Sequence, residues 1–105
     1  IMEIRTKEIS AKDMFNASTR LALKDKVGET LHVVGIFTRD KSGVDGIEGT
    51  VGYVKTDDAI YATISGTTLE QFDALAEMLE TSPVDVKVVS RRSNAGREYF
   101  QLELV

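Results

Sequence analysis

The chain has 105 residues, of which 42% are hydrophobic and 29% charged, and its formal net charge is −4. These values predict one ordinary globular domain and exclude an intrinsically disordered chain. We expect no membrane span, no signal peptide and no disulfide, because no apolar run approaches about 18 residues and cysteine is absent. These features favour a cytoplasmic protein.

The charges are unevenly distributed along the sequence. Residues 56–86 contain seven acidic residues and no basic one, whereas residues 87–105 contain four basic and two acidic residues. A polyanionic ligand would therefore bind away from the acidic middle segment. The alternative interpretation is the ordinary clustering of charge that any domain of this size shows.

A first helix is predicted to begin after Ser10. This serine can cap the helix, Asp13 can return a hydrogen bond three residues later, and Ile9 can pack on Met14. The apolar face that follows predicts a helix that ends near Lys24 to Gly28.

Three strands are predicted next. The segment Thr30–Arg39 is apolar on both faces, which indicates a central strand or one bent at its glycine. Ile47–Lys55 and Asp58–Ser65 are predicted to form a hairpin. Glycines 49 and 52 within it favour a bulge or sharp coil of the kind a small barrel needs.

A second helix is predicted from a capping box formed by Thr67 and Glu70. Its apolar side chains form one stripe, and acidic side chains lie off that stripe, so we expect a surface helix with one buried face. The stripe consists of Leu69, Phe72, Leu75, Ala76 and Leu79. Pro83 ends the segment.

The last segment, Val84–Val105, is predicted to form a β-hairpin. Its two halves alternate apolar and polar residues around a polar turn at residues 92–96. Four basic residues lie in or near the turn, and no acidic residue separates them. They are Lys87, Arg91, Arg92 and Arg97.

The order of the predicted elements is helix, three strands, helix, two strands. This order favours a mainly β (α+β) fold, a five-stranded OB-like Greek-key barrel with a helix between strands three and four. Residues 1–105 would form a single domain, with an N-terminal arm and helix at 1–27 and the barrel at 28–105. The alternative is a different α+β sheet with both helices on one face.

Residues 28–105 resemble OB-fold single-stranded DNA-binding proteins, especially the small ones of bacteriophages. The resemblance rests on residues 28–35 (GETLHVVG), the helix at 67–79, and residues 96–102 (GREYFQL). The chain departs from the bacterial family in showing no acidic C-terminal tail. The resemblance implies a non-enzymatic single-stranded DNA-binding protein of phage or mobile-element replication or recombination, acting in the cytoplasm of a bacterial host.

Such binding needs cations along the phosphate path and aromatic rings on which bases stack. The candidate rings are Tyr53, Tyr61 and Tyr99. The period of two predicts that Tyr61 and Tyr99 point away from the core, and it leaves Tyr53 undecided; each ring could instead cover the sheet. The candidate cations are Lys87, Arg91, Arg92 and Arg97, with Arg39 and Lys55 as secondary candidates.

The sequence offers no catalytic set. Its one histidine, His32, lies among apolar residues, and the acidic pair Asp57–Asp58 lies in a predicted turn. We therefore predict no enzyme activity, no cofactor and no metal. The alternative function is a protein–protein interaction or phage-assembly or replisome accessory module without nucleic-acid binding. DNA is not distinguished from RNA, and a homo-oligomer formed through residues 4–9 or a barrel edge stays open.

Overall fold

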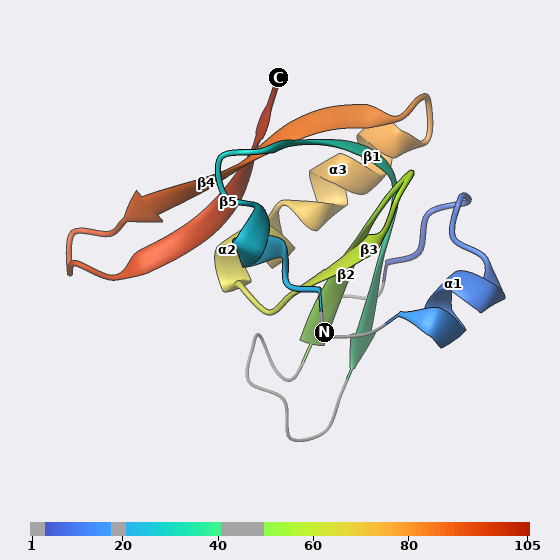
Figure 1. The fold of residues 1–105 in the computed structure, drawn as a ribbon, viewed down its shortest axis with the longest axis horizontal. Coiled ribbons are helices and arrows are strands. Elements are labelled where there is room, and N and C mark those ends of the chain that lie inside the picture. The colour runs from blue at the N-terminus through green and yellow to red at the C-terminus, as the bar shows by residue number, and fades with distance from the viewer. Residues whose placement is uncertain (1–3, 18–20, 41–49) are drawn as a thin grey trace.

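A five-stranded antiparallel sheet with short helices is formed by residues 4–17, 21–40 and 50–105, the part of the chain described by a computed structural model (Figure 1). The helical elements are α1 (Ala11–Asn16), η1 (Leu23–Lys26, a 3-10 helix), α2 (Gly66–Glu70) and α3 (Phe72–Leu79). The strands are β1 (Thr30–Asp40), β2 (Thr50–Thr56), β3 (Ile60–Thr63), β4 (Val84–Arg92) and β5 (Glu98–Leu104). The mainly β class is thereby confirmed.

Strand β1 is the centre of the sheet, whose order is β3-β2-β1-β4-β5. Its first residues, Thr30–Val33, pair with β4, and Val33 together with residues 35–40 pairs with β2. The register shifts between Val33 and Gly35. The prediction of a central strand is therefore confirmed, and the register irregularity lies beside the glycine.

Gly35 allows the N-terminal segment to cross β1 at close range. A Cβ atom at this position would lie 2.9 Å from Ile9 Cδ1 and 3.0 Å from Thr6 Oγ1. The backbone nitrogen of Thr6 donates to Ile36 O at 3.0 Å, and that of Thr38 donates to Ile4 O at 2.9 Å. The N-terminal segment thus adds a short stretch of pairing to one edge of β1.

The capping box of α1 is confirmed. Ser10 Oγ accepts a hydrogen bond from the backbone nitrogen of Asp13, and Asp13 Oδ2 accepts one from the backbone nitrogen of Ser10. The predicted length is wrong, because the helix ends at Asn16. The chain instead turns toward β3, where Leu21 O accepts a hydrogen bond from the Ala62 nitrogen at 2.7 Å. Residues Leu21 and Ala22, which were predicted to lie in the helix, therefore pair with the edge strand β3.

The hairpin of β2 and β3 is confirmed, and β3 is shorter than predicted. Residues 47–49 of the predicted first strand lie outside the described residues. Gly52 forms regular pairs with Thr38 and Thr63, so it is not the site of a bulge. A Cβ atom there would lie 2.5 Å from Leu69 and 2.8 Å from the ring of Phe72. The glycine therefore lets the helices approach the sheet. Gly49 lies outside the described residues.

The predicted cap of the second helix is wrong. The helix begins at Gly66, after Ser65, and no side chain caps it. The neighbouring threonine, Thr68, donates its hydroxyl hydrogen to Phe100 O in β5. The apolar stripe is confirmed, since Leu69, Phe72, Leu75 and Leu79 are buried and Ala76 is partly buried against the core.

Hydrophobic side chains cover both faces of the sheet. The larger cluster lies between the sheet and the helices α2 and α3. The smaller cluster contains Ile9, Phe37, Val51, Tyr53 and Ala62. Because both faces of β2 are covered, six of its seven residues are buried.

The two edges of the sheet are β3 and β5, so the described strands form an open sheet. Within the described residues, no helix has the length and apolar character needed to cross a membrane.

Candidate nucleic-acid interface

The strands β4 and β5 form a hairpin that projects from the rest of the molecule, as Figure 1 shows. We call this hairpin the arm. Its turn is closed by hydrogen bonds from Ser93 N to Arg97 O at 2.8 Å and from Gly96 N to Ser93 O at 2.9 Å. Gly96 has a φ of 81°, which side chains other than glycine rarely adopt. The predicted C-terminal hairpin is confirmed.

The two faces of the arm differ. The register opposes Val88 to Leu102 and Arg91 to Tyr99. Val88 and Leu102 are buried against the body, whereas Tyr99 lies on the opposite face and is partly exposed. The predicted outward orientation of Tyr99 is confirmed.

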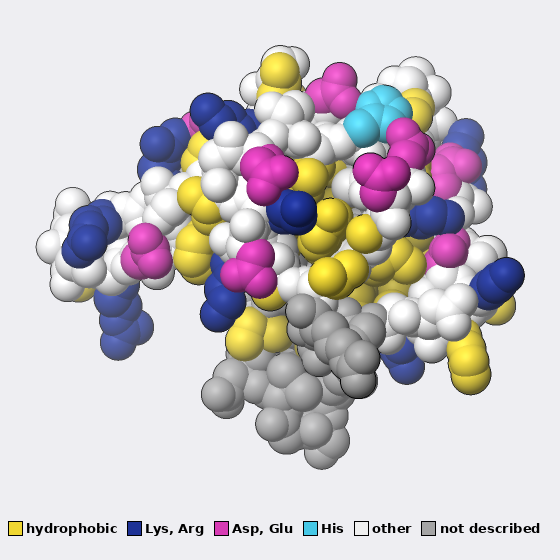
Figure 2. Space-filling view, in the orientation of Figure 1, with side chains coloured by type: hydrophobic (Ala, Val, Ile, Leu, Met, Phe, Trp, Pro, Cys, Tyr) yellow, Lys and Arg dark blue, Asp and Glu magenta, His cyan; other side chains and the backbone are white. Residues whose placement is uncertain are grey.

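The four predicted cations of the arm are all exposed, and Figure 2 shows dark blue side chains gathered on the arm. Arg91 is paired with Glu103 across the two strands. Within the described part of the chain, Lys87, Arg92 and Arg97 form no ion pair. Three of the four positive charges therefore stay available to an anion.

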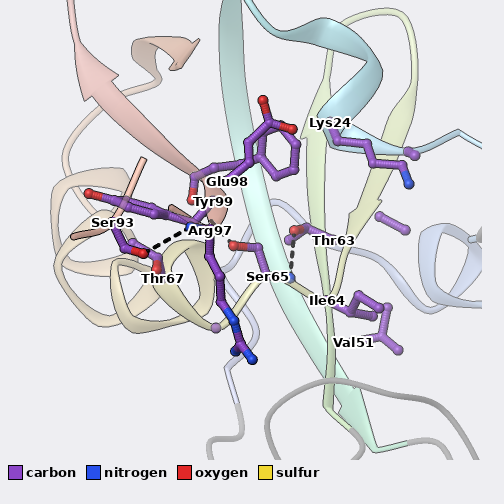
Figure 3. Close-up of a pocket in the computed structure, with 14 residues that line it drawn as sticks. Lys24, Val51, Thr63, Ile64, Ser65, Thr67, Ser93, Arg97, Glu98 and Tyr99 are labelled. Atoms are coloured by element: carbon purple, nitrogen blue, oxygen red, sulfur yellow. Dashed lines mark hydrogen bonds between the residues drawn. The ribbon is translucent and has the colours of Figure 1, made fainter. Parts of the chain in front are cut away.

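A cleft of about 910 Å³ separates the arm from the body. In Figure 3, Arg97 and Tyr99 lie on the arm side, and Lys24, Thr63 and Ile64 lie across from them. Its complete lining consists of Ala22, Lys24, Val51, Ala62, Thr63, Ile64, Ser65, Gly66, Thr67, Ser93, Arg97, Glu98, Tyr99 and Phe100. The cleft therefore combines rings, an exposed isoleucine and two cations.

The edge of β5 contributes main-chain groups to this cleft. Phe100 O and both main-chain groups of Leu102 point away from β4, because they bond to side chains of the segment 65–71. The main-chain groups of successive residues in an antiparallel strand point to alternate edges. The N–H and C=O of Glu98 and the N–H of Phe100 therefore also point away from β4. Among the described residues these groups have no hydrogen-bond partner. A ligand in the cleft can use them.

Of the residues that line the cleft, only Arg97 and Tyr99 were among the predicted site residues, and Lys24 and Phe100 are the most notable of those that were not. Lys24 comes from η1, in a segment predicted to be the end of a helix, and no signal in the sequence placed it near the arm. Phe100 was predicted to be a core residue from its alternation with Tyr99. It is partly buried and lines the cleft.

The other two tyrosines are buried, so neither ring is available for a base in this conformation. Tyr53 is fully buried and stacks on Phe37 with ring centroids 4.7 Å apart. Tyr61 is 9% exposed, with Lys26 Nζ 5.5 Å from its ring centroid. The predicted outward orientation of Tyr61 is wrong, because η1 and the helices cover the face that alternation left to solvent.

Arg39 and Lys55 hold α1 to the sheet. Arg39 Nη1 donates to Met14 O at 2.9 Å, and Lys55 Nζ lies 2.8 Å from Asp13 Oδ2. The hydrogen bond from Lys55 lowers the pKa of the Asp13 carboxyl. Figure 1 shows α1 at the opposite end of the molecule from the turn of the arm, so these cations are not brought together with Arg97.

His32 lies on an exposed strand surface rather than in the core. Its Nδ1 is 2.7 Å from Asp85 Oδ1, and this hydrogen bond raises the pKa of the imidazole. No group of three or more His, Asp or Glu side chains in the described ranges could hold a metal ion.

A scan against protein-family models and searches of curated proteins and of solved structures gave no match to this chain.

Proposed function

We propose that this chain is a non-enzymatic single-stranded DNA-binding domain, and that the strand passes through the cleft and along the arm. One observation carries this proposal: Arg97, Tyr99 and Phe100 of the arm line one cleft, with Lys24 of the body across from them. Rings and cations that share one groove are what sequence-tolerant binding of single strands requires.

The charge distribution supports this path. Lys87 and Arg92 are further exposed cations of β4, and the alternation of the strand places them on opposite faces of the arm. The acidic side chains of α3, Asp73 and Glu77, are exposed on another element. A strand that follows the arm gains attraction from these cations and releases counterions from its phosphates.

We further propose that the sheet is an OB-like barrel with an open side. Strand β1 pairs with both β2 and β4, and the helices lie between β3 and β4, as the OB topology requires. The cleft lies between the edges of β3 and β5, where such a barrel would close. In this arrangement a ligand occupies the opening.

The direct test is fluorescence anisotropy of a labelled dT oligonucleotide, titrated at salt concentrations from about 50 to 200 mM. We expect affinity that falls steeply with salt. Binding weaker than about 100 μM at the lowest salt would contradict the proposal, because even non-specific binders do better than that.

A matched pair of variants tests the location. Arg97→Ala removes a cation of the cleft, and Lys12→Ala removes an exposed cation of α1 at the other end of the molecule. We expect Arg97→Ala to weaken binding and to reduce the salt slope by about one. Equal effects of the two variants would place the strand elsewhere.

A second candidate function is binding of an extended peptide. The unpaired main-chain groups of Glu98 and Phe100 favour it, because a strand can add to an exposed sheet edge. The affinity of such a peptide would depend little on salt. A labelled peptide titrated over the same salt range as the dT oligonucleotide therefore separates the two functions.

A further inference from the structure

Three side chains from the segment between β3 and α3 hold the edge of β5. The hydroxyls of Ser65 and Thr68 donate to Phe100 O at 3.2 and 2.8 Å. The Gln71 amide nitrogen donates to Leu102 O at 2.8 Å, and its oxygen accepts from Leu102 N at 2.7 Å. Gln71 thus makes the two hydrogen bonds that a neighbouring strand would make with Leu102.

The Gln71 contacts lie beside the cleft without forming part of its ligand surface, whereas Ser65 also lines the cleft. Residues 98–100 of β5 line the cleft, and Gln71 holds the strand two residues further on. Neither Gln71 nor Thr68 lines the cleft. Whatever Gln71 contributes to a ligand in the cleft therefore acts through the position of β5.

We propose that Gln71 is a positioning residue that fixes the arm wall of the cleft before a ligand arrives. This inference rests on the proposed DNA-binding function. If the arm occupies its place in only a tenth of the molecules, the apparent affinity falls about tenfold. The loss appears as slower association, because the bound state keeps all its contacts. A residue that touches the ligand changes mainly dissociation.

The substitutions Gln71→Glu and Gln71→Leu test this role. At about pH 8, an ionised glutamate still accepts from Leu102 N but repels Leu102 O, and this repulsion raises its pKa. At about pH 5.5 the protonated fraction grows, and its hydroxyl can donate to Leu102 O in place of the amide. Leucine restores neither hydrogen bond at any pH.

We expect Gln71→Glu to bind a labelled dT oligonucleotide about tenfold more weakly than wild type at about pH 8, mainly through slower association in stopped flow. The deficit should shrink at least about threefold at about pH 5.5. Gln71→Leu should stay weak at both values. Wild type measured at each pH corrects for other titrating groups near this segment, namely Glu70, Asp73 and Glu103.

The amide signal of Leu102 in NMR spectra reports the hydrogen bonds between Gln71 and Leu102, which we call the clamp, without any ligand. Wild-type affinity of Gln71→Glu at both pH values, or a loss confined to dissociation, would overturn the positioning role. If the Leu102 signal recovers at low pH while neither wild type nor variants bind dT, the clamp holds and the proposed function fails. The two hypotheses are thereby separated.

Discussion

The two ends of the molecule use their cations in opposite ways. At the α1 end, Arg39 and Lys55 bind a backbone carbonyl and a carboxylate, and both side chains are partly buried. On the arm, Arg92 and Arg97 are exposed and form no ion pair with any described residue. The same residue types therefore hold the fold together at one end and stay available to an anion at the other. Substitutions in the body should change stability, and substitutions on the arm should change affinity.

The largest effect on stability is expected from Gly52→Ala. Its Cβ would lie within 2.9 Å of the ring of Phe72, which is fully buried in the core. Such overpacking typically costs about 1–3 kcal/mol of the free energy of unfolding. Urea denaturation measures the loss, and the dT affinity of the folded fraction should stay at the wild-type value. An unchanged midpoint would mean that the helices shift freely on the sheet.

The largest effect on affinity is expected from Tyr99→Ala. A stacked base contributes about 1–3 kcal/mol, so binding to dT should weaken at every salt concentration. Tyr61→Phe is the matched control, because it alters a buried ring of the body. The free energy of unfolding of Tyr99→Ala should change by less than about 0.5 kcal/mol. Equal affinity of Tyr99→Ala and wild type would remove this ring from the site.

The same contrast explains how far the sequence predicted the molecule. Alternation placed Tyr99 correctly, because the arm really has one covered face and one open face. It failed for Tyr61, because a period of two cannot indicate that a distant segment such as η1 covers the second face. The capping box at Ser10 is a local contact and was predictable. The departure of the chain after Asn16 depends on pairing with β3, a tertiary contact that local pattern does not contain.

The cleft was the least predictable feature. Its two cations, Lys24 and Arg97, lie far apart in the sequence, and only the fold brings them to one groove. The hydrogen bonds of Gln71 to Leu102 could not be predicted either, because a glutamine between two helical segments is ordinary. Residues whose role depends on long-range main-chain contacts leave no periodic signal.

A smaller effect on stability is expected from Lys55→Met, which keeps the apolar stem and removes the ammonium. The bond to Asp13 lowers the pKa of that carboxyl, so its stabilisation is present above the unfolded pKa near 4 and is lost as pH falls through the folded pKa. The variant should lose about 0.2–1 kcal/mol at neutral pH, and the loss should shrink as the pH falls toward about 2.5. Thermal melts at the two pH values measure this, with Lys12→Met as the control. A loss in dT affinity would mean that Lys55 lies on the DNA path.

The smallest effect is expected from His32, at the joint where the arm meets β1. The pKa of its imidazole is raised mainly by the hydrogen bond to Asp85, with a further contribution from the charge of Asp57. A raised pKa means that the protonated form stabilises the fold fully below the unfolded pKa near 6.5 and loses this contribution as pH rises through the folded value. The melting temperature of wild type should therefore fall slightly from about pH 5.5 to about pH 8, and His32→Gln should lack this component. Because both side chains are more than half exposed, salt should diminish the difference. A wild-type melting temperature that rises over this range by the same amount as in His32→Gln would show that the pair does not stabilise the joint.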